Sequence, residues 1–344
     1  MPALIKRVLS RAANSPVLTG FVSLLERLDR RGDNLLQVLT YHRINDPWAH
    51  PDLAPSTISA TPAIFEMQMT HLAAHYRVVT LAEVYAACYE GAPLPGRAVL
   101  ITFDDAYQDF AEHAWPILKR NGLPATLFVP TAYPDHPERA FWWDRLHATI
   151  GAARGTDTLP VPWVSLALES AQDRKRAYRE LVVWLKSLPD AEARRWLDQL
   201  ADELNEPPAR SHVLGWEALR RLAAEGVALG AHTQTHALMY RVTPEAARAE
   251  AVGSLADLRR QIGDVLPAFA YPGGKFNAAA VEALRAAGFC LAFASRRGIN
   301  RLDTADPLRL RRNHIGFGTS QAVFRARLLS WSLLLNRWRP VTGS

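Results

Sequence analysis

Residues 98–105 have the sequence AVLITFDD, and this stretch decides the fold class. Its first six residues are apolar or Thr, which predicts a strand buried on both faces, as in a parallel sheet. Two carboxylates, Asp104 and Asp105, follow directly at the carboxyl end of that strand. Carboxylates beside a buried strand cost free energy unless they face a polar cavity or a cation, so this edge is a candidate site. An Asp that caps the next helix is the structural alternative.

Strands and helices alternate on both sides of this stretch. Apolar segments predict strands at residues 35–40, 125–129, 227–231, 268–271 and 290–293, and helices are expected at residues 61–76, 110–121, 244–263 and 278–287. This order predicts an α/β protein with a mostly parallel sheet. Polar residues repeatedly follow the strands, which is where a (β/α) barrel places its site, although an open doubly wound sheet uses the same edge.

Three regions depart from this alternation of strands and helices. Residues 141–215 are helical and flanked by prolines, and they predict a helical insertion within a main domain at residues 34–318. Residues 1–33 contain two short amphipathic patterns and predict a helical extension. Residues 319–344 mix Trp and Leu with arginines and predict a basic helix, which can lie on a membrane surface or pack on the protein itself.

The composition limits the kinds of site that the chain can build. It has 344 residues, 2 cysteines and 11 histidines, which excludes a disulfide scaffold and a cysteine-rich zinc module. A metal would have to be held by histidines and carboxylates. The net charge of +6 belongs mostly to the two ends and comes without a nucleic-acid-binding motif. Solvated helix faces explain it, with a peripheral membrane contact as the alternative.

The chain shows no clear export or membrane signal. No run approaches the roughly 20 apolar residues that a membrane-spanning helix needs, and charges at Lys6, Arg7 and Arg11 interrupt any signal peptide. We therefore expect a cytoplasmic protein that is held to a membrane at most by its basic ends. The sequence leaves the oligomeric state open.

A second polar segment, HTQTH at residues 232–236, follows the predicted strand at residues 227–231. On a turn of helix, residues four apart share a face, so the imidazoles of His232 and His236 can reach one ion. Alone, the pair could equally contain a buried structural histidine. A carboxylate from another strand would complete a His₂-carboxylate set with open positions, which is typical of a catalytic metal centre.

A third segment, Tyr271-Pro-Gly-Gly274, ends another predicted strand and is either a tight turn or a loop facing the substrate. The ordered set TFDD, HTxxH and a strand ending in YPxG resembles the polysaccharide deacetylases, the NodB-homology or carbohydrate esterase 4 family. The resemblance covers roughly residues 35–318 without the insertion. The early segment LTYHR at residues 39–43 is similar to the branch that includes the poly-N-acetylglucosamine deacetylases.

The resemblance implies a distorted (β/α) barrel, usually of seven strands, and a divalent metal ion, commonly zinc. By position, it implies Asp104 as the catalytic base and Asp105, His232 and His236 as the metal ligands. The Tyr271 backbone N–H would help to hold the oxyanion. The general acid would be His42 in the branch with the early Tyr-His motif. His314, in a loose match to the late motif of the other branch, is the less favoured alternative.

Two positions depart from the family pattern. Ala106 stands where a glycine usually follows the two aspartates, so the turn must accept a Cβ atom. The arginine that usually orients the catalytic aspartate is missing beside the third motif, and one of the arginines between Arg309 and Arg312 could replace it.

These features predict a metal-dependent hydrolase that removes N-acetyl groups from a polysaccharide or glycan intermediate of the exopolysaccharide type. A hydrolase of small amides or O-acetyl esters on the same fold is the first alternative. A non-catalytic glycan-binding or assembly protein on a decayed barrel is the second.

Overall fold

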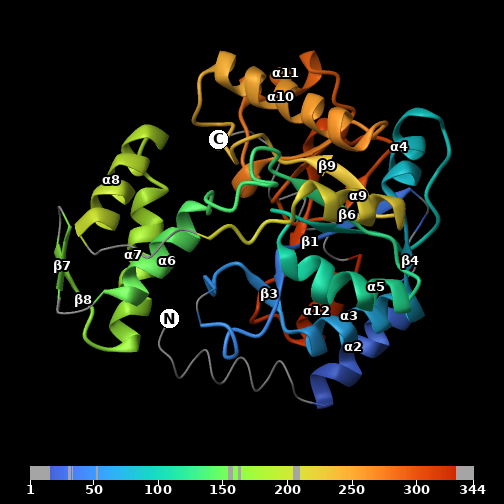
Figure 1. Ribbon diagram of the computed structural model, residues 1–344. Coiled ribbons are helices and arrows are strands. Elements are labelled where there is room, and N and C mark those ends of the chain that lie inside the picture. The colour runs from blue at the N-terminus through green and yellow to red at the C-terminus, as the bar shows by residue number, and fades with distance from the viewer. Residues whose placement is uncertain are drawn as a thin grey trace.

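A computed structural model describes residues 16–29, 32, 34–51, 53–153, 158–161, 164–203 and 210–330 (Figure 1). Its central sheet runs along eight strands, and all neighbours on this path pair in parallel except β12 with β1. In spatial order the strands are β12 (Asn300–Arg301), β1 (Leu35–Tyr41), β5 (Ala98–Phe103), β6 (Thr126–Val129), β9 (Ala228–Ala231), β10 (Ala268–Ala270), β11 (Leu291–Ala294) and β13 (Leu310–Arg311). Two further strands, β4 (Arg77–Val78) and β14 (Asn313–His314), pair with β5 and β1.

One short segment brings the two ends of this sheet together. β13 pairs with β11, and β14, which begins two residues after β13 ends, pairs with β1. The chain therefore crosses from one edge to the other at Arg312, and the sheet becomes a nearly closed barrel. The predicted α/β barrel is confirmed, but the path has eight strands instead of seven.

Alternate residues of the strands pack into two clusters. One cluster contains Leu39 and Phe103 and packs under the helices that follow the strands. The other contains Val38, Leu100 and Phe128 and lies on the opposite face of the sheet. The helices are α3 (Pro62–His75), α4 (Leu81–Tyr89), the π-helix η1 (Phe110–Ala114) running into α5 (Trp115–Arg120), α9 (Trp216–Ala224), α10 (Pro244–Ile262) and α11 (Ala278–Ala286). Short pieces complete the barrel: the pair β2 (Arg43–Ile44) and β3 (Ile58–Ala60), and the 3₁₀ turns η2 (Pro272–Gly274) and η3 (Pro307–Arg309).

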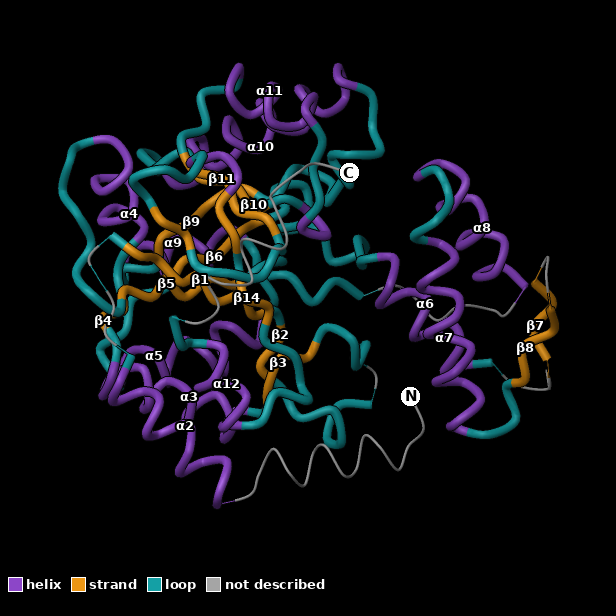
Figure 2. The backbone as a smooth tube through the Cα atoms, turned by 180° about the vertical axis from the view of Figure 1, so that it is seen from behind, coloured by secondary structure: helices purple, strands orange, loops and turns teal. Residues whose placement is uncertain are grey.

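The insertion lies to one side of the barrel in both views (Figures 1 and 2). It has its own apolar cluster and contains α6 (Trp142–Ala152), α7 (Ala171–Leu185) and α8 (Asp190–Glu203). It also contains an antiparallel hairpin of β7 (Thr158–Val161) and β8 (Val164–Ala167), which the helical prediction did not include.

The described parts of the two ends pack together. α2 (Pro16–Leu28) contacts α12 (Gln321–Arg327), and the buried Glu26 carboxylate accepts hydrogen bonds from Arg325 and His71, the latter at 3.0 Å. The remainder of the predicted extensions, residues 1–15 and 331–344, lies outside the described residues. Among the helices that the structure describes, none is long and apolar enough to cross a membrane.

Candidate active site

A pocket of about 290 Å³ opens where the parallel strands end. Six of the seven residues that the sequence singled out line it, and they come from four different segments of the chain. The six are His42, Asp104, Asp105, His232, His236 and His314.

Three of these side chains converge as a metal-ligand set. Asp105 Oδ1 lies 3.5 Å from His232 Nε2 and 3.4 Å from His236 Nε2. This oxygen is buried and has no hydrogen-bond donor among the described residues. A buried carboxylate oxygen without a donor is costly, and a cation between the three atoms would remove that cost. The residues present therefore fit a divalent ion with open coordination positions.

The surroundings set the protonation of these ligands. The His232 ring nitrogen Nδ1 lies 2.7 Å from the carbonyl oxygen of Ala270, which leaves Nε2 with a lone pair for a metal. Burial lowers the pKa of His232 to about 4, so its imidazole is neutral at pH 7. Burial acts to raise the pKa of Asp105, but the nearby imidazoles, His236 first among them, outweigh it and hold the carboxyl below its ordinary range.

The backbone carries strain at the same place. Asp105, Ala106, Thr233 and His236 all have positive φ, between 50° and 72°. Non-glycine residues pay roughly 1–2 kcal/mol each for this conformation. The turn does accept the Cβ of Ala106, at φ 50°, and the Leu214 N–H holds it by donating to the Ala106 carbonyl at 2.9 Å.

Arg312 binds Asp104, the aspartate that is not part of the metal-ligand set. Its Nη1 and Nη2 donate to Asp104 Oδ1 and Oδ2 at 2.7 and 2.8 Å, and both side chains are almost completely buried. Burial acts to raise the pKa of Asp104, and the charge of Arg312 with its neighbours lowers it below the ordinary value. Arg312, from the crossing between β13 and β14, thus contacts the aspartate that the expected arginine would orient. The sequence had narrowed it only to the span from Arg309 to Arg312.

Both candidate acids lie in this pocket. The ring centroids of His42 and His314 are 5.3 Å apart, because His42 follows β1 and His314 ends β14 beside it. Nδ1 of His42 is buried without a hydrogen-bond partner in the described chain. Desolvation and the charge of His42 lower the pKa of His314 to about 3, so the His314 imidazole is neutral at pH 7 and is not an acid of the strength that imidazolium provides.

The backbone N–H of Tyr271 makes a hydrogen bond within the sheet instead of facing the pocket. Its backbone N–H donates to the Phe293 carbonyl at 3.0 Å, continuing the β10–β11 ladder, so it is not available to an oxyanion. Its hydroxyl donates to the Leu308 carbonyl. The next two residues with an N–H, Gly273 and Gly274, line the pocket instead. The Gly274 N–H donates back to the Tyr271 carbonyl, whereas the Gly273 N–H makes no hydrogen bond within the described chain.

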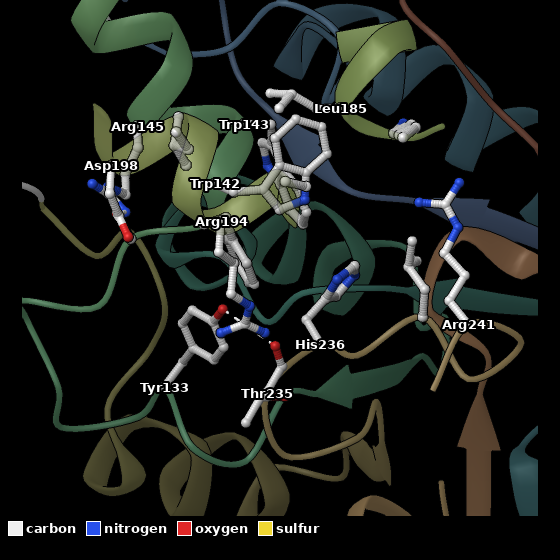
Figure 3. Close-up of a pocket in the computed structure, with 16 residues that line it drawn as sticks. Tyr133, Trp142, Trp143, Arg145, Leu185, Arg194, Asp198, Thr235, His236 and Arg241 are labelled. Carbon is white, nitrogen blue, oxygen red and sulfur yellow. Dashed lines mark hydrogen bonds and ion pairs between the residues drawn. The ribbon is translucent and has the colours of Figure 1, made fainter. Parts of the chain in front are cut away.

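Aromatic side chains from the insertion form one wall. The rings of Trp143 and His236 are 4.9 Å apart, and Phe141 stacks on Trp143 at 4.6 Å. The Trp143 indole N–H donates to the Tyr107 hydroxyl at 3.0 Å. Figure 3 shows Trp142 and Trp143 above His236 in a second cavity of about 240 Å³, which shares these three residues with the first.

The sequence matches one family profile and a short segment of a curated protein. The sequence profile described as polysaccharide deacetylase matches residues 91–292. Over 62 residues the chain is 39% identical to the poly-beta-1,6-N-acetyl-D-glucosamine N-deacetylase of Escherichia coli, which is 18% of this chain and 9% of that protein. The chain therefore aligns with less than a tenth of that curated relative.

Solved structures share the fold at low sequence identity. The Streptococcus pyogenes deacetylase PplD superposes with a TM-score of 0.57 at 20% identity, over 87% of this chain and 99% of that one. IcaB from Ammonifex degensii superposes with a TM-score of 0.56, also at 20% identity, over 88% of this chain and 98% of its own.

Proposed function

The chain belongs to the polysaccharide deacetylase family, and on this premise we propose that it is a metal-dependent hydrolase of N-acetyl groups on a polysaccharide or glycan intermediate. One observation carries the proposal. The set of Asp105, His232 and His236 lies in the same pocket as an aspartate that an arginine holds by two hydrogen bonds.

The substrate class rests on the family and on a named relative. The Escherichia coli protein that shares the short 39% identical segment is named for the deacetylation of poly-N-acetylglucosamine. An N-acetylated amino-sugar polymer or its precursor is therefore the substrate we assign. The wall of Trp142 and Trp143 supports this assignment, because aromatic faces pack well against sugar rings.

The ligand set and Asp104 divide the work of amide hydrolysis. Bound by Asp105, His232 and His236, a divalent ion such as zinc would supply Lewis acidity at the acetyl carbonyl and at water. Asp104 is the general base, and it accepts the proton of the attacking water while Arg312 keeps its carboxylate oriented and ionised. The two adjacent aspartates leave β5 toward different partners, so one residue pair serves both tasks.

His42 is the general acid for the departing amine. It lines the pocket with Asp104, and its charge is among those that lower the pKa of both aspartates. Nδ1 of His42 is buried without a partner in the described chain, so no hydrogen bond there fixes which ring nitrogen carries the proton. For the oxyanion we assign the Gly273 N–H in place of that of Tyr271.

Acetate release tests the proposal directly. Purified protein is analysed for bound metal and then given β-1,6-linked N-acetylglucosamine oligomers before and after treatment with a chelator. We expect about one divalent ion per chain and acetate release that the chelator abolishes and added zinc restores. Asp105→Asn, which removes one ligand charge, is the matched control and should lose both metal and activity.

Two results would contradict it. A metal-free protein that releases acetate regardless of chelator would remove the metal from the reaction. A protein that binds these oligomers but never releases acetate, with zinc fully loaded, would favour a glycan-binding role.

A further inference from the structure

The two cavities beside the metal-ligand set are parts of one space between the insertion and the barrel. Trp142, Trp143, Lys186, His236 and Leu238 line both of them. A substrate whose acetyl group reaches Asp105 therefore extends along this shared wall, toward the end of α7.

Two cations, Lys186 and Arg241, line this space, and the exposed Lys275 lies beside them from a third segment. Lys186 is the C-cap residue of α7, Arg241 is in the loop that follows His236, and Lys275 directly follows the Gly273–Gly274 turn. Nζ of Lys275 and Cζ of Arg241 lie 5.6 and 5.3 Å from the centroid of the Tyr240 ring. Figure 3 shows the Arg241 side chain extending from the barrel loop toward the α7 end at Leu185, and its Nη1 donates to the Leu188 carbonyl at 3.0 Å.

No carboxylate balances this group within the part of the chain that the structure describes. Three acids line the two cavities, and each has other partners. Asp104 is bound by Arg312, Asp105 faces His232 and His236, and Asp198 is paired with Arg145 at 3.0 Å. Desolvation and then the charges of Arg241 and Lys275 lower the pKa of Lys186, so the ammonium is repelled by its neighbours.

An uncompensated cluster costs free energy unless something anionic binds it. The dipole of α7 favours a cation at its C-terminus, which explains Lys186 alone. It does not explain why cations from the loops after His236 and Gly274 converge on the same place. Those two loops also carry the proposed metal ligand His236 and the Gly273 N–H. The same loops therefore position both the cations and the proposed catalytic groups.

We propose that Lys186, Arg241 and Lys275 form a subsite for an anionic group, a phosphate or a carboxylate, which the acetylated substrate carries near the sugar that is deacetylated. The proposal rests on the proposed function and narrows its substrate class to anionic glycans or phosphorylated sugar intermediates. Arg provides a planar fork for such oxyanions, and the two lysines add mobile charge.

Matched substrates test the subsite. The wild type and the double variant Lys186→Met/Arg241→Met are assayed with an N-acetylglucosamine oligomer, with the same oligomer carrying a terminal phosphate, and with one carrying a glucuronate. The control is Lys175→Met, which removes a positive charge at an exposed position of α7 that lines neither cavity. Calorimetric titration with inorganic phosphate measures anion binding without turnover.

We expect the wild type to prefer a charged oligomer over the neutral one by at least tenfold in kcat/KM, and we expect this ratio to fall to about one in the double variant. The preferred oligomer, phosphate or glucuronate, identifies the source of the anion. Phosphate should bind the double variant at least fivefold more weakly, and Lys175→Met should behave as wild type.

Equal kcat/KM for charged and neutral oligomers in the wild type would overturn the subsite and leave the deacetylase proposal intact. Phosphate affinity that is unchanged in the double variant would place the anion elsewhere and also overturn it. Phosphate binding that depends on the cluster, in a protein that deacetylates none of the oligomers, would support an anion site while the proposed function fails.

Discussion

Asp104 and Asp105 are neighbours in the chain, yet their surroundings differ completely. Both oxygens of Asp104 accept hydrogen bonds from Arg312, whereas Asp105 Oδ1 has only two imidazole nitrogens near it and no donor in the described chain. A buried carboxylate with two arginine donors is suited to stay ionised in place, and one without donors is suited to bind a cation.

Asp104→Asn should reduce kcat by about 10²–10⁴-fold, the usual contribution of a general base, and should leave metal binding intact. The amide keeps the size of the carboxylate but cannot accept the proton. Acetate release and metal content are measured on the same sample. Loss of the metal in this variant would show that Asp104 is a ligand and would overturn the division of roles.

Arg312→Met should lower kcat by roughly 10²-fold, the scale of a misplaced catalytic group. Arg312→Lys should recover part of the loss, because lysine keeps the charge but cannot donate two parallel hydrogen bonds. Metal content should be that of the wild type in both. Wild-type kcat in Arg312→Met, measured well below its melting temperature, would mean that Asp104 needs no orienting partner.

How far the sequence predicts the site depends on the kind of contact. Side chains that follow long apolar strands, such as Asp105 and His232, are predictable because strand ends share one edge of a parallel sheet. Arg312 could be narrowed only to a span, since it precedes a two-residue strand without any periodicity. The Tyr271 N–H was misassigned because a backbone hydrogen bond depends on where the ladder stops, and here it continues one residue beyond β10.

At the scale of elements, one buried arginine joins the insertion to the barrel. Arg43 Nη2 lies 2.9 Å from Asp144 on α6, Nη1 lies 3.5 Å from Asp109, and the guanidinium stacks on Tyr107 at 3.6 Å. Burial raises the pKa of Asp109 to about 6 even beside this charge. Arg43 directly follows His42, so this network also fixes the candidate acid relative to the aromatic wall.

Arg43→Met should cost about 3–5 kcal/mol in the free energy of unfolding, because it leaves buried carboxylates without their cation. Urea unfolding followed by tryptophan fluorescence measures it. Arg120→Met, which breaks the exposed pair with Glu66, should cost less than about 1 kcal/mol. If Arg43→Met folds poorly, Arg43→Met/Asp144→Asn should recover stability. If Arg43→Met lost no more free energy of unfolding than Arg120→Met, Arg43 would not anchor the insertion to the barrel.

The element predictions failed where segments are short. The alternating α/β order and the long helices were predictable because each spans several periods of its pattern. The β7–β8 hairpin was missed because four-residue strands next to prolines resemble a loop between helices. Two strands of the sheet path, β12 and β13, were missed for the same reason, since they have two residues each.

At the scale of the whole molecule, Glu26 links α2 near one end to α12 near the other. Its carboxylate accepts from Arg325 Nε at 3.0 Å and lies 3.0 Å from His71 Nε2 on α3. Burial acts to raise the pKa of Glu26, but His71 and Arg325 outweigh it and lower the pKa to about 2. The pair is almost completely enclosed, so it is little screened by solvent.

Glu26→Gln should therefore destabilise the protein by about 2–3 kcal/mol at pH 7. Since the folded pKa lies below that of the unfolded chain, the stabilisation is full above about pH 4.5 and is lost as the pH falls toward 2. The difference between variant and wild type in urea unfolding should shrink over this range. Glu66→Gln, which removes one partner of an exposed ion pair, should change the free energy of unfolding by less than about 1 kcal/mol at any pH. A difference that does not change with pH would contradict the ionic role of Glu26.

The crossing at Arg312 also sets an order of assembly during synthesis. Asp104 and the arginine that grips it are 208 residues apart, so at about 5–20 residues per second a ribosome needs roughly 10–40 s to make the second after the first. His236, the last proposed metal ligand, precedes Arg312 by 76 residues, so for roughly 4–15 s a nascent chain contains all three ligands but has no Arg312 to orient its base. The contact that orients the proposed base can therefore form only after the last strands of the barrel have been made.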